Sequence, residues 1–243
     1  LLNADDSFVA QMSELTDAEV HWFGTSADDD VWGDNIEVSL KGTTFKLHID
    51  EATKPVALNI IGEHHVMNAL AALSVAHLLG LDIDRAIAAL EAMKLAERWR
   101  MQLMPGINGS QIINDAYNAS PESTKAALQT LATIGRQGHR TVAVLGEMAE
   151  LGPQSATEHD SVGRLAVRLN IDQVVVVGDR AKLIHMGASQ EGSWDGESKF
   201  FDSIDEALQY LRGLLGSGDV VLVKSSKSAE LRFLGDALAE VNQ

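Results

Sequence analysis

The sequence contains no cysteine among its 243 residues, which excludes disulfides, thiolate metal ligands and a thiol nucleophile. Basic residues are few: 19 Lys and Arg stand against 35 Asp and Glu, giving a formal charge of −16. This charge repels nucleic acid and anionic membrane surfaces, so we expect no nucleic-acid partner. No run approaches about 20 uncharged apolar residues, so we expect no membrane insertion. A cytoplasmic protein is compatible with these absences.

Three motifs of common nucleotide-binding and hydrolytic enzymes are also missing. The sequence has no Gly-x-x-x-x-Gly-Lys-[Ser/Thr] loop, no Gly-x-Gly-x-x-Gly opening its second half and no Gly-x-Ser-x-Gly elbow. The first absence removes the usual cradle for a γ-phosphate, the second argues against NAD and the third against a hydrolase nucleophile. The sequence starts at Leu1 without an initiator Met or a signal peptide, which suggests a piece of a longer protein.

What is present predicts an α/β protein in two parts. Over residues 1–99, alternating or continuous apolar stretches predict four short strands, and the turn residues between them suggest hairpins. A pair of helices should follow, the first with its apolar residues mostly on one face. The expected elements are strands over Glu19–Gly24, Val31–Leu40, Thr44–Ile49 and Val56–Ile60, a helix from Gly62 to about Gly80, and a helix over Asp84–Met93.

Residues 100–243 instead alternate between strand and helix, which predicts a doubly wound, mostly parallel sheet. The expected strands are Gln111–Asn114, Thr141–Leu145, Gln173–Val177, Lys199–Phe201 and Val220–Val223, and the expected helices are Pro121–Ile134, Ala156–Leu169, Arg180–Met186, Ile204–Leu215 and Ala229–Val241. We place the domain boundary near Arg98–Met101 and expect the second domain to move there as a rigid body.

A doubly wound sheet binds ligands beyond the carboxyl ends of its strands, so the loops that follow predicted strands are the candidate site. These loops are Asp115–Pro121, Gly146–Ser155, Gly178–Arg180 and Lys224–Ser228. In the first loop, the Asp115 carboxylate could accept hydrogen bonds from a vicinal diol such as that of ribose. The alternative is an ordinary strand–helix turn, capped by Ser120, with a solvated carboxylate.

Two further loops carry charge of opposite sign. Glu147 and Glu150 could bind a metal or an ammonium group, or belong to a flexible acidic loop. Lys224, Ser225 and Ser226 combine a cation with hydroxyls beside a helix N-terminus, so they could hold a carboxylate or phosphate, or form a solvated cap.

The segment Gly62–Asn68 enters the first predicted helix and contains the adjacent His64 and His65. Metal ligand pairs on a helix are usually four residues apart, whereas neighbours point apart, so we expect no metal site here. Asn68 can donate and accept hydrogen bonds together, which suits an adenine edge.

Four segments share their pattern with one family. Gly62–Ala72 is similar to Gly-x-His-Asn-x-x-Asn-Ala-x-Ala-Ala. Asp115–Ser123 is similar to Asp-Asp-x-Tyr-Asn-Ala-Asn-Pro-x-Ser, with Asp115 at the second Asp of that pattern. Leu145–Gly152 matches Leu-Gly-[Asp/Glu]-Met-x-Glu-Leu-Gly, and Val223–Ser228 is similar to Val-Lys-Gly-Ser-Arg-Ser. With these motifs the sequence resembles the Mur ligase family over nearly its whole length, and within it the MurF branch. The Asp-Asn-Pro-Arg signature of the MurE branch is absent.

The resemblance implies the tail of a central ATPase domain over residues 1–99 and a Rossmann-like C-terminal domain over residues 100–243. It implies a monomeric peptide ligase that uses ATP and Mg²⁺. The enzyme would add D-alanyl-D-alanine to UDP-N-acetylmuramoyl-tripeptide through an acyl phosphate, in peptidoglycan synthesis. The catalytic residues and magnesium ligands would lie outside this sequence, so we expect no catalytic or metal-binding residue here and no activity from the chain alone.

The resemblance also implies two groups of contacts. The ATP site would include His64, Asn68, Arg98, Arg100, Asp115, Tyr117 and Asn118. The amine-substrate site would include Glu147, Glu150, Leu151, Lys224, Ser225 and Ser226.

The sequence departs from the family pattern at several places. His65 stands where Asn is usual, Asn114 replaces the first of two Asp, and Ser225 replaces Gly. Two alternatives stay open: another ligase of the same fold (MurE, MurC, MurD or a folylpolyglutamate synthase), or a non-catalytic nucleotide-binding module.

Overall fold

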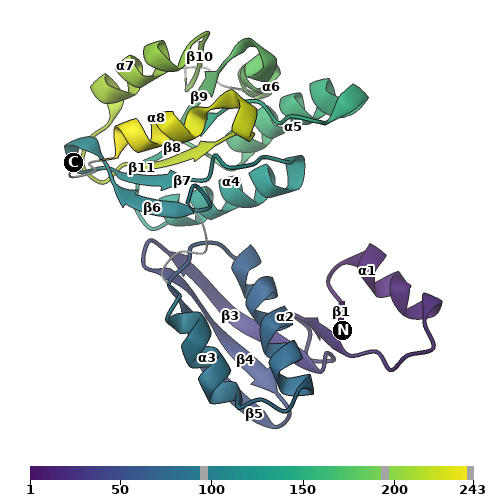
Figure 1. The fold of residues 1–243 in the computed structure, drawn as a ribbon. Coiled ribbons are helices and arrows are strands. Elements are labelled where there is room, and N and C mark those ends of the chain that lie inside the picture. The colour runs from purple at the N-terminus through teal and green to yellow at the C-terminus, as the bar shows by residue number, and fades with distance from the viewer. Residues whose placement is uncertain (94–97, 193–196, 240–243) are drawn as a thin grey trace. The chain divides into compact units, whose positions relative to one another are not determined.

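The computed structural model describes residues 1–93, 98–192 and 197–239. The chain forms two compact units, Leu1–Leu95 and Ala96–Gln243, and each unit has a sheet of its own (Figure 1). Within the described residues no strand is shared between the two sheets. The expected α/β class is confirmed, and each unit is described below by itself.

The first unit is built on a mixed five-stranded sheet in the order β1-β2-β3-β4-β5. Its strands are β1 (Leu2–Asn3), β2 (Trp22–Gly24), β3 (Val31–Ser39), β4 (Gly42–Ile49) and β5 (Ala52–Leu58). Strands β3 to β5 form the expected hairpins, but β2 lies parallel to β3, so the hairpin prediction was wrong for β2. Residues 25–30 join these two strands, and this connection is longer than the two-residue turn that pairs neighbouring strands as a tight hairpin.

Helices pack on this sheet through apolar stripes. α2 (His64–Leu78) packs against β2, β3 and β4, and α3 (Ile83–Glu91) packs against β5. Leu70 and Leu73 of α2 meet Phe45 and Leu47 of β4 in the core, where all four are buried. The sequence did not predict two short helices, α1 (Ser7–Gln11) and η1 (Met12–Leu15).

The second unit is a six-stranded sheet in the order β10-β9-β8-β11-β7-β6. The strands are β6 (Gln102–Pro105), β7 (Gln111–Asn114), β8 (Thr141–Leu145), β9 (Gln173–Val177), β10 (Ser198–Phe201) and β11 (Val220–Lys224). All neighbouring strands are parallel except β6, which pairs antiparallel with β7 at the edge.

Helices cover both faces of this sheet, so its central strands are apolar on both sides. Val142 and Val144 belong to a core that also holds Leu211 of α7 and Leu231 of α8. The helices are α4 (Pro121–Gly135), α5 (Ser155–Arg168), α6 (Lys182–Glu191), α7 (Ile204–Leu214) and α8 (Leu231–Leu238). In Figure 1, α7 and α8 lie on one face of the sheet and α4 and α5 on the other.

Most expected elements of this unit are confirmed to within a few residues. The sequence analysis assigned no element to Gln102–Pro105 and therefore missed β6, a four-residue strand that includes Pro105. Pro is tolerated there since β6 is an edge strand. Helix α6 begins at Lys182, later than expected, after a short 3-10 turn over Asp179–Ala181. Helix α8 spans Leu231–Leu238, whereas the predicted helix was Ala229–Val241, and residues 240 and 241 of that prediction lie outside the described residues.

Candidate functional site

Three of the expected loops start at one edge of the second unit's sheet. In the strand register, Asn114 of β7 lies opposite Val223 of β11, and Lys224 of β11 lies opposite Leu145 of β8. The carboxyl ends of these parallel strands are therefore level, and the loops that leave them are neighbours. This is the edge where doubly wound sheets bind ligands.

A buried ion pair joins the first and last of these loops. The Lys224 Nζ lies 2.6 Å from an Asp115 carboxylate oxygen, and the exposed fractions of the two side chains are 3% and 14%. The same ammonium donates to the backbone oxygen of Asn118 at 3.0 Å. The other Asp115 carboxylate oxygen accepts from the backbone N–H of Met101 at 3.0 Å. A buried cation needs such partners, since an unpaired one would be strongly unfavourable.

Ser226 connects three loops. Its hydroxyl accepts from the Ala149 backbone N–H at 2.8 Å and donates to the Ala119 backbone oxygen at 3.4 Å. The backbone N–H of Ser226 donates to the Glu147 backbone oxygen at 2.8 Å. Ser225 is also fully buried. The resemblance implied that Lys224, Ser225 and Ser226 contact the amine substrate, and that role stays a prediction. The observed contacts show that they hold the loops together.

Close packing also fixes the loop that begins at Gly146. A Cβ atom at Gly146 would stand 2.8 Å from the Ser225 Cβ, so a larger side chain would push the two loops apart. Further along, the backbone N–H of Met148 donates to His159 Nε2 at 3.0 Å, and His159 Nδ1 lies 2.7 Å from the backbone oxygen of Ser155. His159 is buried and therefore acts as a support for this loop.

The segment from Arg98 to Met101 is bound into the second unit. Asp236 of α8 accepts from Trp99 Nε1 at 3.0 Å and from an Arg98 guanidinium nitrogen at 3.0 Å. The Tyr117 backbone N–H donates to the backbone oxygen of Trp99 at 3.2 Å. The rigid-body motion expected about these residues stays a prediction. The contacts place Arg98 and Trp99 with the second unit.

Cations flank the aromatic ring of Tyr117. The Arg100 guanidinium carbon lies 4.5 Å from the ring centroid, and Lys227 Nζ lies 5.5 Å from it. Asn118 beside it has an exposed side chain. Asp115, Tyr117, Asn118, Arg98 and Arg100, which the sequence assigned to an ATP site, thus share one edge of the second unit.

The other two residues of that predicted site lie in the first unit. His64 and Asn68 are exposed and stand four residues apart, so they share one face of α2. His65 beside them is different: its Nε2 is buried and has no hydrogen-bond partner. Burial, together with the neighbouring His64, lowers the pKa of His65 to about 4.

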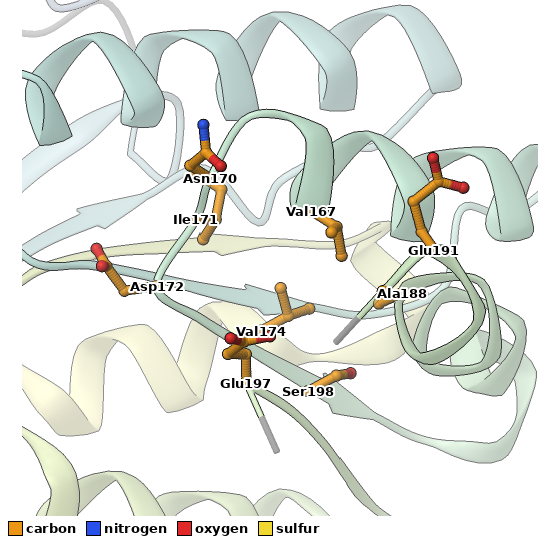
Figure 2. A pocket seen from close by; sticks show the side chains of 10 residues that line it. Val167, Asn170, Ile171, Asp172, Val174, Ala188, Glu191, Glu197 and Ser198 are labelled. Atoms are coloured by element: carbon orange, nitrogen blue, oxygen red, sulfur yellow. The ribbon is translucent and has the colours of Figure 1, made fainter. Parts of the chain in front are cut away.

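Two cavities lie at opposite edges of the second unit's sheet. The larger, about 370 Å³, is lined by the end of α5, the starts of β9 and β10 and the end of α6 (Figure 2). It sits at the amino ends of the strands, away from the converging loops. The smaller, about 220 Å³, includes Glu147, Gly178, Asp179 and Arg180 and lies at the carboxyl ends. Position therefore favours the smaller cavity as part of the site.

Sequence reasoning missed some residues of this region. Asp236 lies on α8, far along the chain from the loops it holds, and no motif marked it. Arg180 belonged to a loop that was flagged, but the side chain was given no role; its Nη1 lies 3.3 Å from a Glu147 carboxylate oxygen. Glu150, with a positive φ of 66°, and Leu151 continue the loop; their predicted role is untested.

Comparison with known protein families finds a matching domain in each part of the chain. Residues 1–76 match the Mur ligase middle domain, and residues 99–227, more than half of the chain, match the Mur ligase glutamate ligase domain. The chain belongs to the Mur ligase family. The resemblance inferred from the motifs is confirmed.

Curated relatives point to one branch of the family. The chain is 42% identical over 98% of its length to the UDP-N-acetylmuramoyl-tripeptide–D-alanyl-D-alanine ligase of Mycobacterium tuberculosis. It is 31% identical over 99% of its length to the ligase of that name from Escherichia coli K12. These matches cover 50% and 52% of the two relatives, so the chain spans about half the length of the Mur ligases it matches.

Solved structures agree in fold. A crystal structure of MurF from Acinetobacter baumannii superposes with a TM-score of 0.84 at 29% identity, over 98% of this chain and 51% of that one. MurF from Thermotoga maritima in complex with ADP superposes with a TM-score of 0.74 at 23% identity, over 90% of this chain and 48% of that one. Among the described residues, no helix is long and apolar enough to cross a membrane.

Proposed function

We propose that the chain is part of a MurF-type ligase, which uses ATP to join D-alanyl-D-alanine to UDP-N-acetylmuramoyl-tripeptide in peptidoglycan precursor synthesis. The observation that carries the proposal is 42% identity over 98% of the chain to a ligase of that name. A MurE-type ligase of Bacillus velezensis, named for 2,6-diaminopimelate, is 27% identical over 97% of the chain. The difference in identity favours the MurF branch.

In the proposed reaction, ATP phosphorylates the terminal carboxylate of the tripeptide, and the dipeptide amine then attacks the acyl phosphate and releases phosphate. The residues described here would bind and orient substrates for these steps. His64 and Asn68, exposed on one face of α2, would bind adenine. Asp115 would bind ribose. A carboxylate has about four lone-pair sites, and the contacts from Lys224 and Met101 leave capacity for a ribose hydroxyl.

Other residues would shape the nucleotide site. The stacked pair of Arg100 and Tyr117 presents a cation and a ring at the same edge as Asp115. Asn118 and Arg98 add exposed polar groups there. Lys224 and Ser226 would act through these groups, because their buried side chains hold the loops in place.

Magnesium would enter with the phosphates. No cluster of three or more His, Asp or Glu side chains suited to a metal ion occurs in the part of the chain that the structure describes. The described residues therefore do not fit a magnesium site. The protein would work in the cytoplasm as a monomer.

The test is a substrate panel with the full-length protein, ATP, magnesium and each muramoyl acceptor with its amine. Phosphate release with UDP-N-acetylmuramoyl-tripeptide and D-alanyl-D-alanine is the expected result. Turnover only with 2,6-diaminopimelate, L-alanine or D-glutamate and the matching acceptors would move the protein to another branch. Nucleotide binding without any turnover would favour a binding module.

A further inference from the structure

The cavity of about 220 Å³ at the carboxyl ends of β8 and β9 has two kinds of lining. Ile204, Ala229 and Leu231 supply apolar surface, while the charged lining residues are Glu147, Asp179, Arg180 and Asp202. The cavity therefore combines one guanidinium with several carboxylates and an apolar surface. Of these charged residues, the sequence motifs assigned only Glu147 to the amine substrate and gave Arg180 no role.

Arg180 has spare hydrogen-bonding capacity. Its Nη1 lies 3.3 Å from one Glu147 carboxylate oxygen and 3.5 Å from the other, so the contact is long for a charge-assisted bond. The Arg180 side chain is 79% exposed and that of Glu147 is 19% exposed. A guanidinium has five N–H donors and binds carboxylates through two parallel bonds, so a carboxylate ligand can replace this weak contact.

We propose that this cavity binds the amine substrate as a small zwitterionic dipeptide, with the C-terminal carboxylate on Arg180 and the amino group toward Glu147. The inference rests on the proposed ligase function. An extended dipeptide spans roughly 7 Å, at about 3.3–3.6 Å per residue, and two methyl side chains suit the apolar surface. The carboxylates outnumber the single guanidinium, which suits the amino group of the dipeptide. Glu147 becomes available to that amino group once Arg180 binds the carboxylate of the ligand.

The cavity also leaves the nucleotide loop free. In the sheet order, β9 is separated from β7 by β8 and β11. Neighbouring strands are about 4.8 Å apart, so β9 stands roughly 14 Å from β7, whose end carries Asp115. A dipeptide and a nucleoside can therefore bind at this edge together, as a ligase that joins an amine to an activated carboxylate requires.

The experiment compares D-alanyl-D-alanine with its C-terminal amide in the full-length enzyme. Wild type should prefer the dipeptide over the amide. R180A should raise KM for the dipeptide about 10- to 100-fold, because it removes the charged hydrogen-bonded contact to the substrate carboxylate. R180A should also lose the preference between the two substrates, while KM for ATP stays unchanged. R180K, which keeps the charge without the bidentate geometry, should fall between.

R136A is the matched control, because Arg136 is an exposed arginine at the far end of α4, and it should behave as wild type. Since Arg180 is mostly exposed, R180A should fold, which circular dichroism checks. If wild type uses the dipeptide but R180A keeps both its KM and its preference, this assignment is overturned and the proposed function stands. If wild type does not use the dipeptide at all, the proposed function fails, and the assignment fails with it.

Discussion

Replacing Asn114 by the aspartate that the family pattern carries should destabilise this protein. Asn114 is fully buried, and its Nδ2 donates to the Arg232 backbone oxygen at 2.9 Å and to the Asp236 carboxylate at 3.2 Å. A Cβ atom at Gly235 would collide with this amide, so α8 lies directly against it. N114D replaces the donor by an oxygen that faces two acceptors.

The cost follows from charge and hydrogen bonding. Two unit charges about 4 Å apart repel by about 4 kcal/mol at an effective dielectric constant near 20. The new carboxyl group can avoid this by staying protonated. Holding a carboxyl of ordinary pKa about 3.9 neutral at pH 7 costs about 4 kcal/mol, at 1.36 kcal/mol per pKa unit. A protonated group still satisfies only one acceptor. Because Arg98 also contacts Asp236 and offsets part of the repulsion, we expect a loss of about 2–4 kcal/mol at pH 7.

The sign of the pH dependence provides a specific test. The folded-state pKa of the new group would be raised, so the loss is small below its unfolded pKa and grows as pH rises toward the folded value. Urea unfolding and hydrogen exchange at Ile112 and Ile113 should show a larger loss at pH 7.5 than at pH 5. N114D/D236N should recover part of the loss. N118D adds the same charge at an exposed position and should have little effect. If N114D matched wild type at pH 7.5, the reasoning would be refuted.

Four other outcomes are expected. D115A should lower the stability of the second unit by about 3–5 kcal/mol in urea unfolding, because it leaves the ammonium of Lys224 buried without its carboxylate. K224M should lower the stability less, and equal losses in the two variants would contradict this reasoning. In the full-length enzyme, D115A should also weaken ATP binding. Since the pKa of His65 is lowered to about 4, the stability of the fold should fall by up to about 3 kcal/mol as pH drops from 6.5 to 4. H65N introduces the residue that is usual in the family pattern, and it should remove this pH dependence in thermal unfolding. The chain alone, which has no phosphate-binding loop, should release no phosphate with the tripeptide, D-alanyl-D-alanine, ATP and magnesium; turnover near a normal ligase rate would show that the catalytic groups were misplaced.

The sequence by itself determined the class of the fold and the edge that carries the site. Unbroken apolar runs such as Val174–Val177 and the alternation of strand and helix are local patterns, and they specify a parallel sheet covered on both faces. The carboxyl ends of its strands then follow from topology. The order of residues in the motifs was enough to assign the family.

Only the tertiary structure decided what the polar residues of that edge do. Lys224 read as a group that could hold an anion, but it is buried against Asp115, more than a hundred residues earlier in the chain. Asp236 and Arg180 were unassigned for the same reason: their partners, Asn114 and Glu147, are brought to them by helix and sheet packing. Strand β2 pairs parallel with β3, which the local pattern did not predict, because the pairing direction of a strand depends on its neighbours in space. Contacts between distant segments carry no periodic signal, since periodicity records only which face a residue occupies.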